Sequence, residues 1–138
     1  MTGRTVTGSH GIPVVADTLF SQCDYADAAL LFLPGGLPGA TNLQAHTGLC
    51  QLLTAKASQP DVIISAICAA PLVLGGLGIL QGKQATCYPG CESGMGSANM
   101  ISDAACVRDG KLITGASAGC AIPFGLMLVE AMKGRETA

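Results

Sequence analysis

The sequence predicts one α/β domain with three layers, in which helices cover both faces of a largely parallel sheet. Two continuous apolar runs, residues 28–33 and 62–67, each end at a turn, which is typical of strands covered on both faces. Segments with helical spacing alternate with these runs, as in sheets built with crossover helices. The 138 residues suit one domain, and no change of charge or composition marks a linker. We therefore expect residues 1–138 to form a single domain.

Composition narrows the class of protein. Hydrophobic residues make up 49% of the chain and charged residues 12%, which excludes intrinsic disorder, and no segment has the roughly 20 apolar residues of a membrane-spanning helix. The net charge of −2 and the lack of a Lys/Arg cluster speak against nucleic acid or a membrane surface as partner. The seven cysteines lack the spacing of a secreted disulfide scaffold, and no signal peptide opens the sequence. A soluble, cytoplasmic protein with reduced thiols is expected.

The first half of the chain predicts a hairpin, a strand and a helix. Residues 5–20 carry short β-branched stretches broken by glycine and proline, which predicts a small hairpin. The strand at 28–33 ends at Pro34-Gly35-Gly36. Leucines near helical spacing then predict one amphipathic helix over 42–57, with Pro60 just beyond its end.

The second half predicts a strand, a sharp turn and a helix, followed by shorter elements. The strand at 62–67 gives way at Cys68 to a helix, and Pro71 suits its first turn. A short strand, a hairpin with an Asp-Gly turn and a final helix are expected at 84–88, 105–114 and 124–132.

Cys68 is the first candidate for chemistry, because it stands between a strand and a helix. In such a nucleophile elbow the turn lifts the side chain above the sheet edge, and backbone N–H groups at the helix start can receive an oxyanion, with Ala69 as the natural donor. The helix N-terminus also favours the thiolate that attacks. The alternative is that Cys68 is a small buried hydrophobic residue, the commonest fate of a free cysteine. Spacing alone leaves both interpretations open.

Three motifs follow one another along the chain: Leu33-Pro34-Gly35-Gly36, then Ala66-Ile67-Cys68-Ala69-Ala70-Pro71, then Thr86-Cys87-Tyr88-Pro89. In order and spacing they resemble the ThiJ/PfpI superfamily, in its DJ-1-like branch. The similarity covers essentially the whole chain. It implies a flavodoxin-like sandwich, like that of class I glutamine amidotransferases, which is usually a homodimer and carries an oxidation-sensitive nucleophilic cysteine at the position of Cys68.

The resemblance also implies the site and its substrates. Gly36 and Ala69 would supply oxyanion amides, Gly35 lies in the same turn, and Tyr88 stands where some relatives place a histidine near the cysteine. The small residues at 115–119 either border this pocket or merely allow close packing. Implied activities are cofactor-free conversion of glyoxal-type aldehydes and repair of early glycation adducts. The expected substrate is thus a small aldehyde or a glycated compound, and no cofactor or metal is expected.

The sequence departs from the family pattern at its beginning. Relatives open with a βαβ unit whose helix bears a glutamate that hydrogen-bonds the cysteine, whereas this chain opens at what resembles the following hairpin. None of the nine Asp/Glu residues matches that glutamate, and Glu92 is better explained as a solvated loop residue. The resemblance thus indicates an N-terminally truncated member whose strand at 28–33 has an open edge that favours self-association. Whether it is an enzyme stays open, and a non-catalytic redox-sensing or chaperone-like protein is the alternative.

Other patterns point less clearly to a site. The pairs His46 and Cys50, and Cys87 and Cys91, have a spacing that could supply two metal ligands each, but neither has a complementary pair, so packing roles are favoured. Peptidase-type relatives carry a histidine directly after the nucleophile, where this chain has Ala69. The His-Pro-Glu motif of glutamine amidotransferases is also absent. These observations count against both rival enzyme classes.

Overall fold

The computed structural model describes residues 3–137 and centres on a four-stranded sheet in the order β3-β4-β8-β7. Strands β3 (Leu30–Leu33), β4 (Ile63–Ile67) and β8 (Leu112–Gly115) are parallel, and β7 (Cys106–Asp109) runs antiparallel to β8. All five residues of β4 are buried, as expected for a central strand. The predicted largely parallel sheet is confirmed.

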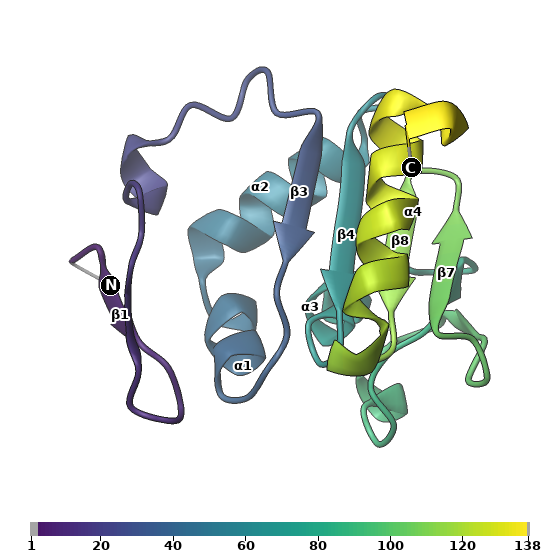
Figure 1. The fold of residues 1–138 in the computed structure, drawn as a ribbon, viewed down its shortest axis with the longest axis horizontal. Coiled ribbons are helices and arrows are strands. Elements are labelled where there is room, and N and C mark those ends of the chain that lie inside the picture. Colours follow the sequence, from purple (N-terminus) through teal and green to yellow (C-terminus); the bar gives the residue numbers. More distant parts are fainter. Residues whose placement is uncertain (1–2, 138) are drawn as a thin grey trace.

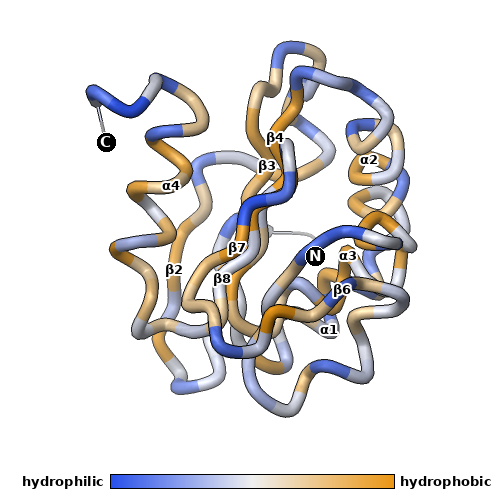
Figure 2. The backbone as a smooth tube through the Cα atoms, turned by 90° about the vertical axis from the view of Figure 1, so that its right-hand side faces the viewer, coloured by the Kyte–Doolittle hydropathy of each residue, from blue (hydrophilic) through white to orange (hydrophobic). Residues whose placement is uncertain are grey.

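Helices cover both faces of this sheet, and the three layers are seen in Figure 2. One face carries α2 (Thr47–Ala57) and α3 (Pro71–Gly76), with α1 (Gly39–Gln44) beside them, and the other carries α4 (Ala121–Lys133). Each interface has its own apolar cluster, and Phe124 of α4 packs among the isoleucines of the second one. The predicted three-layer arrangement is therefore confirmed. Within residues 3–137 no helix is long and apolar enough to cross a membrane.

The predicted hairpins are both present. Strands β1 (Thr5–Thr7) and β2 (Pro13–Val15) pair antiparallel and stand apart from the main sheet (Figure 1). The hairpin of β7 and β8 turns at Gly110, whose φ of +61° explains the glycine there. The remaining short elements are η1 (Phe20–Gln22), β5 (Gln84–Ala85), η2 (Glu92–Gly94), β6 (Asn99–Met100), η3 (Ala118–Cys120) and η4 (Arg135–Thr137).

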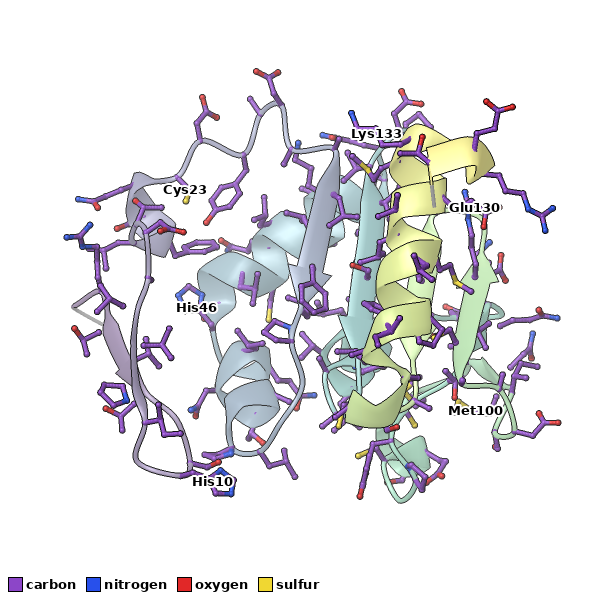
Figure 3. All side chains as sticks on the ribbon, in the orientation of Figure 1. His10, Cys23, His46, Met100, Glu130 and Lys133 are labelled. Carbon is purple, nitrogen blue, oxygen red and sulfur yellow. The ribbon has the colours of Figure 1, made fainter. Side chains whose placement is uncertain are left out.

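In place of the single helix predicted over 42–57, the structure has two helices, α1 and α2. They are separated at His46, whose backbone is extended and whose Nδ1 accepts the N–H of Leu49 at 3.0 Å. The ring of Phe20 packs edge-on against His46, with ring centroids 4.8 Å apart, and Figure 3 shows His46 at the start of α2. A side chain that caps an N-terminus competes with helix continuation, and this explains the break.

Strand β3 is confirmed, but it is less covered than its apolar run suggests. Among the described residues it pairs only with β4, so it is an edge strand, and the side chain of Phe32 is 46% exposed. A cavity of about 590 Å³ is lined by residues of the β1–β2 hairpin and of η1 and by residues of the segment that follows β3. Val6 and Phe20 line one side of it, and Gly36 and Leu43 line the other. An open edge and an apolar cavity therefore lie next to the glycine turn.

Candidate active site

Cys68 has a left-handed backbone at the end of β4. Its φ is +63°, and within residues 3–137 it is the one residue other than glycine with a positive φ. For a residue with a Cβ this conformation costs about 1–2 kcal/mol. Pro71 then occupies the first turn of α3. The predicted strand-turn-helix elbow is present. The chain changes direction at Cys68 because this residue has the left-handed backbone conformation.

Backbone hydrogen bonds hold the elbow from two sides. The N–H of Cys68 donates to the Gly115 carbonyl at 2.8 Å, and the Cys68 carbonyl accepts the N–H of Tyr88 at 2.9 Å. The turn itself is closed by the N–H of Ala70, which donates to the Ile67 carbonyl at 3.1 Å. A strained backbone conformation persists only where the surrounding contacts hold it in place, and such positions cluster at functional sites. The Cys68 side chain remains partly exposed and so accessible to a ligand.

Gly35 packs directly on this elbow. A Cβ placed on Gly35 would lie 2.5 Å from the Cys68 Cβ, 2.6 Å from the Ile67 carbonyl oxygen and 3.2 Å from the Ala69 nitrogen. Real Cβ atoms essentially never approach other atoms as closely as the first two of these distances, so glycine is required there. The next residue, Gly36, has a φ of +96°, which also favours glycine. The structure thus places the glycine turn after β3 against the cysteine.

Two backbone amides at this junction donate no hydrogen bond within the part of the chain that the structure describes. Among the hydrogen bonds of residues 3–137, none uses the N–H of Gly36 or of Ala69 as donor. Ala69 is buried, whereas Gly36 lies on the exposed rim. Unpaired amides beside a nucleophile can stabilise negative charge on an oxygen of a bound substrate. The arrangement is therefore suited to oxyanion binding, which is the role that the family resemblance implies for this pair and which stays a prediction.

Tyr88 reaches the site through its backbone. Its amide holds the Cys68 carbonyl, and its side chain is 48% exposed. The segment before it is fixed by two buried threonines: Thr114 Oγ1 accepts the N–H of Thr86 at 2.9 Å, and Thr86 Oγ1 donates to the Ala104 carbonyl at 3.3 Å. A role of the Tyr88 hydroxyl in binding substrate stays a prediction.

The thiols beside the site and the nearby carboxylate have shifted pKa values. Burial, then the charges of Cys68 and Glu92, raises the pKa of Cys91. Burial, then the charges of Glu92 and Cys91, raises the pKa of Cys87 to about 11. Hydrogen bonds from the backbone amides of Glu92 itself and of Gly90, the latter at 2.8 Å, lower the pKa of the exposed Glu92 carboxyl. Glu92 is therefore an ionised loop residue, and within residues 3–137 no carboxylate hydrogen-bonds the Cys68 thiol.

Gly115 is a site residue whose role the sequence left open. Its carbonyl accepts the Cys68 amide, and a Cβ on it would lie 2.8 Å from the Phe124 ring and 2.9 Å from Ile67 Cγ1. Close packing between β8, β4 and α4 thus explains this glycine. The run of small residues at 115–119 was the one signal that could have indicated it.

One of the two possible pairs of metal ligands, His46 and Cys50, has other partners. His46 caps α2, and the Cys50 thiol donates to the Gln44 carbonyl at 3.3 Å. In the part of the chain that the structure describes, no group of three or more His, Cys, Asp or Glu side chains is placed to hold a metal ion.

Comparison with known proteins identifies the family, since residues 1–131 match the DJ-1/PfpI family. The chain belongs to this family. Protein DJ-1 homolog B of Arabidopsis thaliana is 37% identical over 134 residues, which are 96% of this chain and 30% of that protein. Protein dj-1beta of Drosophila melanogaster is 33% identical over 135 residues, which are 97% of this chain and 72% of that protein.

Solved structures of the family share the fold. The crystal structure of Drosophila melanogaster DJ-1beta superposes with a TM-score of 0.91 at 32% identity and covers 98% of this chain and 73% of that one. The flavodoxin-like α/β fold predicted from the resemblance is thereby confirmed. The chain spans only 30% of the Arabidopsis relative's length and less than three quarters of the Drosophila relative's length.

Family members have different activities. A deglycase of Pyrococcus horikoshii is 30% identical over 112 residues, or 66% of its length. An isonitrile hydratase of Pseudomonas putida is 32% identical over 134 residues, or 57% of its length. Because one fold carries several chemistries, membership of the DJ-1/PfpI family does not by itself settle the reaction of this chain.

Proposed function

We propose that this DJ-1/PfpI protein acts on small reactive carbonyl compounds through the Cys68 thiol, in cofactor-independent glyoxalase- or deglycase-type chemistry. The observation that carries the proposal is the elbow: a partly exposed cysteine in a left-handed turn, followed by the amide of Ala69 and packed against the glycine turn with the amide of Gly36, neither of which donates a hydrogen bond within residues 3–137. The deglycase relative supports the same class of substrate, a small aldehyde or a glycated compound.

The first half of such a reaction needs only these groups. The Cys68 thiolate attacks the aldehyde carbon, the carbon–sulfur bond forms, and the carbonyl electron pair moves to the oxygen. The amides of Gly36 and Ala69 then stabilise the alkoxide, and Gly35, which has no side chain, allows the glycine turn to pack against the elbow. The Tyr88 side chain, which is 48% exposed, would help to orient the substrate through its hydroxyl.

The second half needs a base. Conversion of the adduct to a hydroxy acid moves a proton from the former aldehyde carbon to its neighbour, and water then releases the product. No carboxylate of residues 3–137 hydrogen-bonds the Cys68 thiol. We therefore expect adduct formation to be more robust than turnover.

The alternative function is non-catalytic: a redox-sensing or chaperone-like protein in which Cys68 is oxidised without turnover. The absence of a carboxylate on the thiol, within the described residues, favours it. An oxidized DJ-1 of Toxoplasma gondii is also a close structural relative, with a TM-score of 0.90 at 30% identity. This function requires only an accessible, reactive thiol.

A homodimer is proposed as the assembly. The edge strand β3 exposes Phe32, and the outer face of α4 exposes Ile122 and Leu126, with 78% and 50% of their surfaces accessible. Ile122 and Leu126 are four residues apart on α4 and so lie on one face, and contiguous exposed apolar surface is typical of association sites. Sedimentation velocity over a range of protein concentrations tests the proposal, and a monomer throughout would contradict it.

The activity test uses methylglyoxal, which gains one water to become lactate. Purified protein should produce lactate above the level of a Cys68→Ser control that folds to the same thermal midpoint. Lactate at the control level would overturn the enzyme proposal. Intact-mass measurement then distinguishes the alternative, because a Cys68 adduct without lactate fits a thiol that reacts but does not turn over.

The redox alternative has its own test. Mild peroxide should add oxygen to Cys68 before any of the other six cysteines, because Cys68 is partly exposed on a strained turn. Peptide mass spectrometry after brief treatment measures the order. Uniform oxidation of the seven cysteines would contradict the redox-sensing function.

A further inference from the structure

Two thiols outside the elbow meet where β7 lies beside the turn that precedes α4. Cys106 begins β7 and is paired with Gly115 of β8, while Cys120 ends the short η3 helix. The Cys106 thiol donates to the Cys120 carbonyl at 3.9 Å, across a separation of 14 residues. Both side chains belong to the apolar cluster under α4. Cys106 is partly exposed, whereas Cys120 is 6% exposed.

We propose that Cys106 and Cys120 form an oxidisable dithiol that closes into an intramolecular disulfide, a modification site separate from Cys68. The fold brings the two residues together because the β7–β8 hairpin returns the chain to the start of β7. A bond between them would join β7 covalently to the beginning of α4. The cross-link would join two residues that are 14 positions apart, which restricts the unfolded chain and so stabilises the fold.

The chemistry needs a two-electron oxidant, for which a small disulfide such as glutathione disulfide serves. The Cys106 thiolate attacks one sulfur of the oxidant, forms a mixed disulfide and releases one glutathione thiolate. The Cys120 thiolate then attacks the Cys106 sulfur and releases the second glutathione. In total two protein thiols lose two electrons and two protons, and one glutathione disulfide becomes two glutathione molecules.

The rate of this step should depend on pH. Burial, followed by the charge and the hydrogen bond of the Cys120 thiol, raises the pKa of Cys106 to about 11. At neutral pH little of Cys106 is therefore thiolate, and only the thiolate attacks. Disulfide formation should be slow near neutral pH and should speed up about tenfold for each unit by which the pH rises toward that pKa.

The disulfide would also change the turn next to the elbow. The Cys120 thiol donates to the Ser117 carbonyl at 2.9 Å, and its sulfur accepts the Ser117 amide at 3.2 Å. Oxidation removes the S–H, so the Ser117 carbonyl loses its donor while the amide keeps an acceptor. This turn directly follows Gly115, whose carbonyl holds the Cys68 amide. The modification would thus act on the segment that supports the active-site cysteine.

The test is disulfide mapping after treatment with glutathione disulfide at pH near 7 and near 9, in wild-type protein and in Cys68→Ser. Digestion with trypsin and an Asp-specific protease separates the two thiols, because residues 103–108 contain Cys106 alone and residues 112–133 contain Cys120 alone. These two peptides should appear joined, faster at the higher pH and equally in Cys68→Ser. A reductant should separate them, and the oxidised protein should unfold several degrees higher.

Matched variants sharpen the result. Cys120→Ser should leave Cys106 as a mixed disulfide with glutathione, whereas Cys50→Ser, at a thiol bonded elsewhere, should leave the joined peptides unchanged. The proposal is overturned if wild-type Cys106 accumulates as the mixed disulfide or if Cys120 pairs with another cysteine. Because Cys68→Ser abolishes the proposed carbonyl chemistry and not this pair, failure of one proposal is distinguishable from failure of the other.

Discussion

Gly35 and Cys68 come from separate motifs, yet a methyl group on Gly35 would lie 2.5 Å from the Cys68 Cβ. Because of this contact, the positions of the glycine turn and of the nucleophile elbow depend on each other. Any side chain at Gly35 must displace the elbow, and any change of the elbow alters the space above the glycine. The candidate site is therefore defined by the pairing of β3 with β4, which sets the two turns side by side.

Replacing Gly35 by alanine should destabilise the protein by about 1–3 kcal/mol, because the new methyl overlaps backbone and Cβ atoms that cannot move freely. Urea denaturation measures the change. Gly39→Ala is the matched control, since a Cβ at that helical position meets nothing within 4 Å. Equal stabilities of Gly35→Ala and the wild type would show that the elbow is not held as tightly as the contact indicates.

Cys68→Gly should be more stable than Cys68→Ala by about 0.5–1 kcal/mol. Alanine keeps the cost of a Cβ at a φ of +63°, whereas glycine removes it, and the greater freedom of glycine in the unfolded state offsets part of the gain. Both variants lack the thiol, so they differ only in backbone strain and one methyl group. Urea denaturation of the two variants measures the difference in their free energies of unfolding. A higher value for Cys68→Ala than for Cys68→Gly would argue against backbone strain at this position.

Thr114→Val should cost about 1–3 kcal/mol, because the buried N–H of Thr86 then loses its acceptor while the shape of the side chain is kept. Thermal and urea unfolding measure the loss. The control is Thr54→Val, which removes a hydrogen bond to the Cys50 carbonyl on an exposed helix face and should change stability by less than about 0.5 kcal/mol. Similar effects of the two substitutions would contradict the prediction.

Stability should fall as the pH rises from about 9 to about 11. In the folded protein the pKa values of Cys87 and Cys106 are about 11, above the usual value of 9.0, so the unfolded chain releases protons first and deprotonation favours unfolding. Below about pH 9 both states keep these protons and this dependence vanishes. Tyr25, whose pKa burial raises to about 12, continues the trend at higher pH.

The alkaline effect is measured by urea denaturation under reducing conditions across this window. Cys87→Ala should make the fall of stability with pH shallower, whereas Cys50→Ala should keep the wild-type dependence. A free energy of unfolding that stays constant between about pH 9 and pH 11 would be incompatible with raised thiol pKa values.

Local signals predicted much of the fold. The buried run at 62–67, the cysteine after it and Pro71 identify β4, the elbow and α3, because each depends on residues adjacent in the sequence. The turn at Gly110 and the final helix were predicted for the same reason. The failures involve partners from elsewhere in the chain. His46 ends one helix and starts another while Phe20 packs on it, and no periodicity in the helix indicates that contact.

The sequence by itself determined that a cysteine stands between a buried strand and a helix, and that a glycine turn follows another apolar strand. Tertiary structure alone decided that Gly35 packs on Cys68, that the Gly115 carbonyl holds the Cys68 amide, and that Cys106 meets Cys120. These contacts depend on the order and register of β3, β4, β8 and β7. Strand order brings together residues far apart in the chain, and local pattern carries no information about such distances.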